Sequence, residues 1–292
     1  MKVDGALVNV GLAQVAARAR ELESTGYDAL YTFEGPHDPF FPLLLAAEHT
    51  ERVELMTAIA IAFARNPMNL AQLGDDLQRA SHGRFVLGLG TQVKPHIEKR
   101  FSMTWSSPVE RMRELVTAVR AIWATWHDRV PLDFRGDHYR HTLMTPFFDP
   151  GPSEYGPPRV FLAGVGPRMT EMAGEMADGF IVHPFASEQS LRELTLPALA
   201  RGRARSALAD AAFEVALPAL VATGTTDAEL ESAVQSVRAQ LAFYGSTPAY
   251  KVVLDVHGWG DLQPELNRLS KEGRWDVMAG LFTDEMVDTF AV

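Results

Sequence analysis

The chain has 292 residues, close to the ~250 residues of a single α/β barrel. Its net charge of −10 argues against a nucleic-acid partner, because proteins bind phosphate backbones with basic surfaces. The absence of cysteine excludes disulfides, thiolate metal sites and cysteine nucleophiles. No apolar run approaches the ~20 residues of a membrane span, and the first residues show no signal-peptide pattern. We therefore expect a cytoplasmic enzyme with no membrane partner.

Short apolar runs alternate with amphipathic segments, which predicts strands alternating with helices. Seven strands are expected, at residues 3–8, 28–33, 53–61, 84–89, 159–165, 179–183 and 213–221. Helices are expected between them, at residues 11–25, 42–50, 67–83, 108–126, from Pro167 onward, 187–207 and 225–243. This alternation calls for a parallel sheet, and strands that are apolar on both faces favour a closed barrel. The predicted fold class is α/β, a TIM-type (β/α)8 barrel forming one domain over residues 1–292.

An eighth strand is harder to place. Either residues 250–256 form it, or it lies beyond Val292, because the sequence stops within an apolar run. Excursions from the barrel are expected at about residues 92–108, 128–157 and 244–292. The aromatic side chains of residues 128–157 predict that this excursion is buried rather than a linker.

Ligands of such barrels bind at the C-terminal ends of the strands and in the loops that follow. Glu34, His37 and Asp38 follow the second predicted strand, so this segment is either a ligand-binding loop or a turn braced by prolines. Small residues at the end of the third strand, at Ala58 and around it, would let a flat ring approach the backbone. A plain core strand explains the same composition.

Two further loops follow the same rule. Gly90 and Thr91 end the fourth strand, where glycine lets a ligand approach the backbone. His96 and Arg100 come next and share a helix face, which is either part of a site or simply solvated. His183 ends the sixth strand and is either a ligand contact or a hydrogen-bonded structural residue.

The loop after the fifth strand carries the clearest local signal. It contains Ala163, Gly164, Val165, Gly166, Pro167, Arg168 and Met169. Glycines end the strand, and Pro167 begins a helix whose first N–H groups can receive a phosphate. A tight strand–helix turn is the alternative. No metal-ligand motif, serine nucleophile elbow, Walker A motif or Rossmann fingerprint is present. A phosphate grip without such groups is typical of an enzyme whose cofactor performs the chemistry.

Several segments together resemble the bacterial-luciferase-like superfamily, in particular its coenzyme F420-dependent oxidoreductases. The matching pieces are residues 26–31 leading to Glu34, 57–59 followed by 65–67, 83–85 with 88–91, 163–168 and 173–179. No single piece is specific, but the order matches that of the superfamily along residues 1–292.

The resemblance implies a TIM barrel that binds FMN or the deazaflavin F420 at its mouth. It implies a non-prolyl cis peptide between Ala58 and Ile59, against the central ring, and a cofactor phosphate in the loop after the fifth strand. The cofactor contacts implied are Glu34, Thr57, Ala58, Ile59, Gly90, Thr91 and residues 163–169. The chain departs from many relatives after the second strand, where Glu34-Gly35 stands in place of Asp-His.

The leading hypothesis is an F420-dependent oxidoreductase that transfers a hydride between a small organic substrate and the deazaflavin. His37, or less favourably His96, would move the proton. The alternatives are an FMN-dependent monooxygenase that uses reduced flavin and oxygen, and a barrel that serves as a non-catalytic partner subunit. Superfamily resemblance also implies a homodimer through the helices after the first two strands. Aromatics of the excursions suggest an apolar or flat substrate: Phe101, Trp105, Phe147, Phe148, Trp259 and Trp275.

Overall fold

A computed structural model describes the whole chain, residues 1–292. The chain divides into two compact units. The first comprises Met1–Ala163 and Ala177–Gly179, and the second comprises Gly164–Met176 and Phe180–Val292. The interpretation of the chain as one domain stays a prediction.

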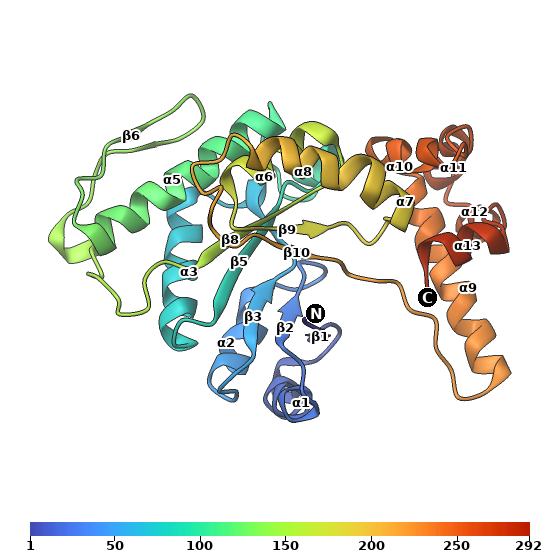
Figure 1. Cartoon of the computed structure of the whole chain (residues 1–292), viewed down its shortest axis with the longest axis horizontal. Coiled ribbons are helices and arrows are strands. Elements are labelled where there is room, and N and C mark those ends of the chain that lie inside the picture. Colours follow the sequence, from blue (N-terminus) through green and yellow to red (C-terminus); the bar gives the residue numbers. More distant parts are fainter. The chain divides into compact units, whose positions relative to one another are not determined.

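The first unit is built on parallel strands that follow one another in chain order (Figure 1). They are β1 (Asp4–Ala6), β2 (Ala29–Thr32), β3 (Glu54–Thr57), β5 (Phe85–Gly90) and β8 (Arg159–Gly164). The short strand β4 (Ala60–Ile61) also pairs with β5. Each pair is parallel, so the loops after these strands lie at the same edge of the sheet. All six residues of β5 are buried, as expected for a strand covered on both faces.

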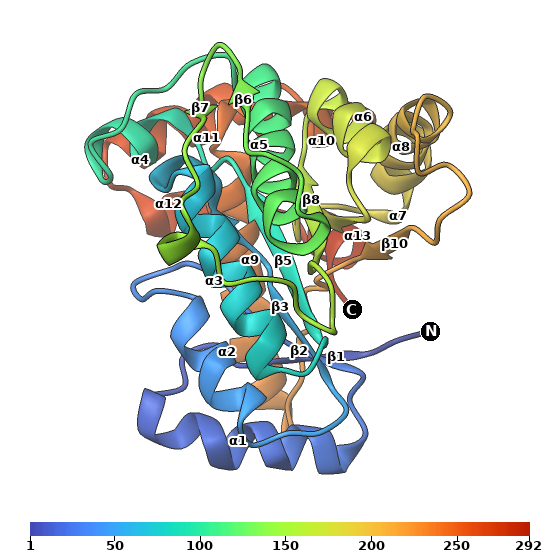
Figure 2. The same cartoon turned by 90° about the vertical axis from the view of Figure 1, so that its left-hand side faces the viewer.

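Helices of the first unit connect these strands. They are α1 (Leu12–Thr25), α2 (Phe40–Ala47), α3 (Pro67–Ala80), α4 (Lys94–Lys99) and α5 (Pro108–Asp128), with 3₁₀ turns η1 (Ala62–Ala64) and η2 (Pro146–Phe148). Asn66 caps α3 by accepting from the Asn69 amide at 3.0 Å. Helices α3 and α5 pack side by side (Figure 2), and the Trp123 indole donates to the Ala71 carbonyl at 3.0 Å. Gly74 permits this approach, because a Cβ there would lie 2.8 Å from the Trp123 ring.

A two-stranded hairpin, β6 (Phe134–Arg135) and β7 (Arg140–His141), lies within residues 128–157. Its turn is held from α5, because the Glu114 carboxylate accepts from the backbone amides of Asp137, His138 and Tyr139 at 3.0, 2.7 and 2.5 Å. Gly136 leaves space for that carboxylate, which the Cβ of any other residue would overlap.

Two aromatic residues of this excursion contradict the expectation of burial. Phe147 is 89% exposed and Phe148 is 67% exposed. They pack edge to face against each other, with ring centroids 5.1 Å apart, within the short turn η2. A single 3₁₀ turn lacks the length to bury an apolar face, so the prediction is wrong for these two residues.

The second unit contains two strands and a series of helices. Strands β9 (Gly179–Val182) and β10 (Glu214–Ala216) are neighbours in the sheet. The helices are α6 (Pro167–Met176), α7 (Glu188–Ser190), the π-helical turn η3 (Leu191–Thr195), α8 (Leu196–Arg203), α9 (Asp227–Gly245), the 3₁₀ turn η4 (Pro248–Tyr250), α10 (Lys251–Val256), α11 (Leu262–Lys271), α12 (Trp275–Ala279) and α13 (Asp284–Phe290). Helices α11, α12 and α13 pack against α9 (Figure 1), around a core that includes Leu241, Leu266 and Phe282.

The expectation of a strand at residues 250–256 is wrong. Most of this segment forms helix α10, which buries Val253 and Leu254 in the helical core and packs the partly buried Val252 against it. The chain instead pairs at its last residues, where Ala291 forms a parallel bridge with Leu220 and the Val292 amide donates to the Leu220 carbonyl at 3.0 Å. No helix combines the length and the apolar character that a bilayer span requires.

Candidate functional site

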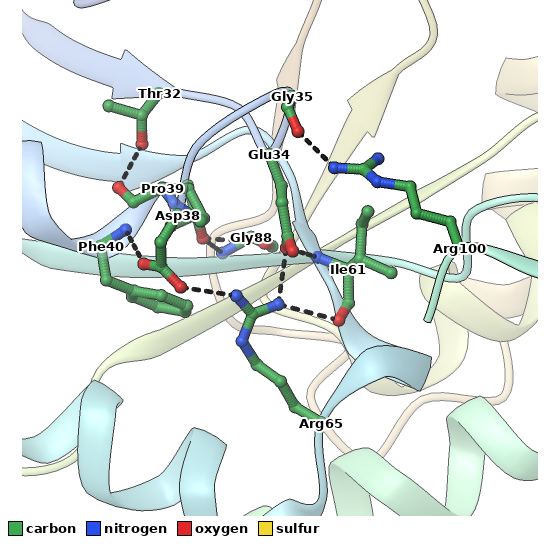
Figure 3. A network of polar contacts seen from close by, with 11 residues as sticks. Thr32, Glu34, Gly35, Asp38, Pro39, Phe40, Ile61, Arg65, Gly88 and Arg100 are labelled. Carbon is green, nitrogen blue, oxygen red and sulfur yellow. Dashed lines mark hydrogen bonds and ion pairs between the residues drawn. The ribbon is translucent and has the colours of Figure 1, made fainter. Parts of the chain in front are cut away.

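A buried carboxylate anchors the loop after β2. Only 6% of the Glu34 side chain is exposed. Its Oε2 accepts from the Ile61 amide at 2.7 Å and from the Arg65 guanidinium at 2.5 Å (Figure 3). The Glu34 amide donates to the Ile59 carbonyl at 3.0 Å. These contacts attach the loop after β2 to the backbone after β3.

Arg65 joins both acids of this loop. Its second terminal nitrogen donates to Asp38 Oδ2 at 2.8 Å, and its first also reaches the Ile61 carbonyl at 3.2 Å (Figure 3). The other oxygen of Asp38 accepts from the Phe40 amide at 2.9 Å, at the start of α2. Each carboxylate of the loop is therefore paired with a cation and a backbone amide, so both side chains hold the loop in place.

The end of β3 lies against this network. The peptide bond between Ala58 and Ile59 is cis, as the resemblance implies. The Ala58 amide donates to the Thr32 carbonyl at 2.6 Å. The Thr57 side chain is fully buried, and its hydroxyl donates to the Gly88 carbonyl at 2.8 Å and accepts from the Gly88 amide at 2.9 Å. Thr57 thus joins β3 to β5 through its side chain.

Small residues at the end of β5 accommodate the residue after the cis bond. A Cβ at Gly90 would lie 2.9 Å from Ile59 Cδ1, so the glycine makes room for that side chain. Thr91 donates from its hydroxyl to the Gln92 carbonyl at 2.9 Å. Gln92 has a positive φ of 59°, which turns the chain toward α4.

The two histidines proposed for proton transfer are both exposed in the first unit. His37 borders a cavity of about 790 Å³ beside the loops after β1 and β2, and its imidazole has no protein partner. His96 lies on α4, near Arg100. The Arg100 guanidinium donates to the Gly35 carbonyl (Figure 3), so the chain beyond α4 is tied to the loop that carries His37.

The predicted phosphate loop lies in the second unit from Gly164 onward, with Ala163 as the last residue of the first unit's main segment. A Cβ at Gly164 would lie 2.7 Å from Met169 Cγ, so this glycine allows Met169 to pack. A Cβ at Gly166 would meet nothing within 4 Å. Val165 packs against the helical core, and α6 begins at Pro167 as predicted. The loop therefore combines a packed base with open space beside Gly166.

His183, at the end of β9, is enclosed by two tyrosines. Its ring centroid lies 4.7 Å from that of Tyr244 and 4.5 Å from that of Tyr250. Nδ1 accepts from the Phe185 amide at 3.0 Å, which leaves the hydrogen of the neutral ring on Nε2. Burial lowers the pKa of His183 to about 4 and raises the pKa of Tyr250 to about 12. The structural interpretation of His183 accounts for these contacts.

The structure brings the predicted site residues together in two groups. One group, around Glu34, belongs to the first unit, and the other, Gly164–Met169, belongs to the second. Arg65 joins the first group and was not among the residues selected from the sequence. The available signal is the position of Arg65 just after the third predicted strand. Glu34 and Asp38 follow the second predicted strand, and the ends of neighbouring parallel strands lie at one edge of a sheet.

Comparisons with known proteins agree with the resemblance. A family model described as luciferase-like monooxygenase matches residues 2–292. An uncharacterized protein of Mycobacterium tuberculosis is 58% identical over 292 residues, which cover 100% of this chain and 86% of that protein. A putative coenzyme F420-dependent oxidoreductase of the same organism is 29% identical over 286 residues, covering 91% of this chain and 79% of that one.

Similarity also extends to solved structures. A coenzyme F420-dependent tetrahydromethanopterin reductase from Methanopyrus kandleri superposes with a TM-score of 0.79 at 19% identity, covering 100% of this chain and 85% of the reductase. This likeness shows the fold, and it confirms the predicted α/β class, a luciferase-like TIM barrel with inserted segments.

Proposed function

The chain belongs to the luciferase-like monooxygenase family, and from this membership we propose that it is an F420-dependent oxidoreductase. The reaction proposed is hydride transfer between a small organic substrate and the deazaflavin. The family comprises oxidoreductases and monooxygenases, so an enzymatic role follows from membership. The F420-dependent relatives described above favour the deazaflavin over FMN.

The observation that carries the proposal is the fit of the loop before α6 to a cofactor phosphate. The space beside Gly166 is open, so a ligand can approach the backbone there. The first amides of a helix have no acceptor within the helix and carry a partial positive charge, which attracts a phosphate. Arg168 adds a full positive charge in the first turn. We assign the phosphate to Gly164, Val165, Gly166, Pro167, Arg168 and Met169, with Ala163 before them.

We assign the cofactor ring to the end of β3 and its neighbours. Ala58, Ile59 and Gly90 would lie against the ring, with Glu34, Thr57 and Thr91 holding the backbone around them. The residues present fit such a role, because the polar side chains of the Glu34 network are paired with one another and with the backbone. They leave no unpaired charge to face a flat ring. When bound, the deazaflavin supplies the acceptor or donor of a hydride.

The protein itself would move the proton. His37 is exposed, has no hydrogen-bond partner and borders a cavity, so its ring nitrogens are available to a substrate. Imidazole is the side chain most often used in general acid–base catalysis. The carboxylates of Glu34 and Asp38 are unsuited to this role, because Arg65 holds both. His96 is the second choice.

The test is a pair of fluorescence titrations of the purified protein, one with F420 and one with FMN. We expect F420 to bind with the lower Kd. Tight FMN binding together with no F420 binding would overturn the choice of cofactor. Binding of neither would favour a non-catalytic partner subunit. With F420 bound, His37→Asn should lower kcat by about 100-fold or more, whereas the same change at His96 should have a small effect.

The family description favours a second candidate, an FMN-dependent monooxygenase. It predicts that an oxygenated product forms when the protein is mixed with chemically reduced FMN, oxygen and a substrate, and that no such product forms without the protein. We also propose a homodimer through α1 and α2. Leu44 on α2 is 41% exposed, and a second copy would cover it. Light scattering measures the mass directly, and Leu44→Lys should shift it toward the monomer.

A further inference from the structure

The cavity beside His37 lies where a barrel binds its substrate. It has a volume of about 790 Å³ and is bordered only by residues 7–12 and 32–42. These segments follow β1 and β2 directly, at the C-terminal ends of two adjacent parallel strands. Pockets of ~300–1,000 Å³ hold small organic ligands. The position and size suit a small molecule rather than a protein segment.

Apolar side chains form most of the cavity wall. They include Leu7, Val8, Val10, Leu12, Phe33 and Phe41, together with several prolines. Leu7 is buried, whereas Leu12 and Phe41 at the rim are 54% and 62% exposed. Apolar walls of this kind bind apolar ligand surface by excluding water.

Two of the four polar residues at the wall are occupied. The Thr32 hydroxyl donates to the Pro39 carbonyl at 2.8 Å. The Asp38 carboxylate is held by Arg65 and by the Phe40 amide. Asn9 and His37 have side chains without a protein partner. They are the groups left to contact a polar atom of a ligand.

No lysine or arginine borders the cavity. Of the two cations in the surrounding network, Arg65 is bound to Glu34 and Asp38, and Arg100 donates to the Gly35 carbonyl. A phosphate or carboxylate placed here would lose water without gaining a positive partner, and it would lie near the Asp38 charge. Desolvation of an unpaired charge is strongly unfavourable. The wall therefore disfavours anionic ligands.

We infer that this cavity is the substrate pocket and that it takes an uncharged, mainly apolar molecule with one hydroxyl or carbonyl oxygen, which His37 and Asn9 contact. That the ligand is a substrate rests on the proposed function, whereas its chemical class rests only on the residues that line the cavity. The predicted aromatic excursions are not needed for this selectivity, because the cavity is complete without them.

The experiment is ligand-observed NMR titration of the full chain without cofactor. The probes are cyclohexanone and 2-acetylnaphthalene as neutral ketones, and glucose 6-phosphate as an anionic molecule. Each of two variants replaces an exposed leucine at the first residue of a helix with lysine. Leu12→Lys changes the cavity rim, and Leu196→Lys is a matched control, a 47% exposed leucine at the start of α8 that does not border the cavity.

We expect both ketones to bind with a Kd at least about tenfold below that of glucose 6-phosphate. Leu12→Lys should weaken ketone binding by about tenfold, because a charge then borders the apolar wall, and Leu196→Lys should not. Stronger binding of glucose 6-phosphate, or equal effects of the two variants, would overturn the inference. So would a fall in molecular mass caused by Leu12→Lys without a change in ketone binding, since the face would then be covered by a second copy.

The two proposals fail separately. The ketone titration contains no F420, so its outcome does not depend on the cofactor. If F420 fails to bind while the ketones bind as expected, the proposed reaction is wrong and the pocket assignment stands. If F420 binds and the ketones do not, the pocket assignment is wrong and the proposed cofactor stands.

Discussion

The loop after β2 and the loop before α6 both follow a parallel strand, yet they are built in opposite ways. In the first, the side chains of Glu34 and Asp38 are paired with Arg65, and the backbone of the neighbouring strand supplies further partners. In the second, Gly166 leaves the backbone accessible and the space beside it open. The first loop is held by side chains of the protein, whereas the second leaves its backbone accessible, as the proposed phosphate site requires.

This difference shows how to interpret charged residues at the end of a strand. Two acids and a histidine in one loop suggest catalysis from the sequence. The structure gives the acids a positioning role, and of the three only His37 is without a partner. In contrast, the loop with few polar side chains is the one that we propose for the phosphate, because glycine lets a ligand approach the backbone amides.

The largest expected effect comes from breaking the held loop. Arg65→Met leaves the Glu34 carboxylate buried without its cation, which should lower the free energy of unfolding by about 3–5 kcal/mol. Urea denaturation measures it. Arg18→Met is the control, because it removes an exposed ion pair with Glu21 and should cost no more than about 1 kcal/mol. Equal losses in the two variants would mean that the Glu34 network does not hold the loop.

The buried His183, which follows strand β9, should make the free energy of unfolding depend on pH. The pKa of His183 is lowered to about 4 by burial, whereas in the unfolded chain it is about 6.5. Between these values the unfolded chain binds a proton that the folded chain does not, so stability falls as the pH drops from 6.5 to 4. The loss should be on the order of 3 kcal/mol.

His183→Asn tests this, because the asparagine oxygen can still accept from the Phe185 amide. The variant should lose less stability than the parent chain between pH 6.5 and 4. Above pH 7.5, His183 is neutral in both the folded and the unfolded parent chain. The pH dependence of unfolding should there be the same for the parent chain and the variant. A pH dependence that survives the substitution would assign it to other groups.

Blocking the open loop should affect binding and not folding. A Cβ at Gly166 would meet no atom within 4 Å, so we expect Gly166→Trp to change the free energy of unfolding by no more than about 0.5 kcal/mol. F420 affinity should fall by about 100-fold or more, equivalent to about 2.7 kcal/mol. Gly164→Val offers the reverse case, because its side chain would collide with Met169 and should destabilise the fold. An unchanged F420 affinity in Gly166→Trp would remove the phosphate from this loop.

The smallest effect is expected where a single hydroxyl joins β3 to β5. Thr57→Val keeps the shape of the side chain and removes its hydrogen bonds to Gly88. The loss should be about 1–2 kcal/mol, because the Gly88 amide is left without that partner in a buried place. Thr57→Ser retains the hydroxyl and serves as the control. Equal thermal stability of Thr57→Val and the parent chain would contradict this role.

Much of the fold follows from sequence patterns because the buried strands are short, apolar and bounded by turn residues. The range 84–89 differs from β5 by one residue at each end, and the start of α3 at Pro67 is marked by its cap. Residues 250–256 are wrongly predicted as a strand because Val252, Val253 and Val256 resemble one, and only packing against α7, α11 and the helical core selects the helix. Local β-propensity is readily overridden by tertiary contacts of this kind.

Site residues were harder to predict than strands. The position of Glu34 follows from the rule that ligands bind at strand ends, but its pairing with Arg65 depends on two loops meeting in space. The same holds for the cavity beside His37, whose wall combines the segments after β1 and β2. Exposure of Phe147 was unpredictable from composition, since apolar residues supply much of any protein surface.

The hydrogen bonds from the hairpin turn to Glu114 limit which residues can stand together at positions 114 and 136. The Glu114 carboxylate occupies the space that a side chain at Gly136 would need. A random library at both positions, selected for folding, should therefore return glycine at 136 wherever glutamate stands at 114. Bulkier residues at 136 should survive only alongside a shortened partner on α5. Covariation of two positions that lie 22 residues apart in the chain would show that the turn and the helix are selected together.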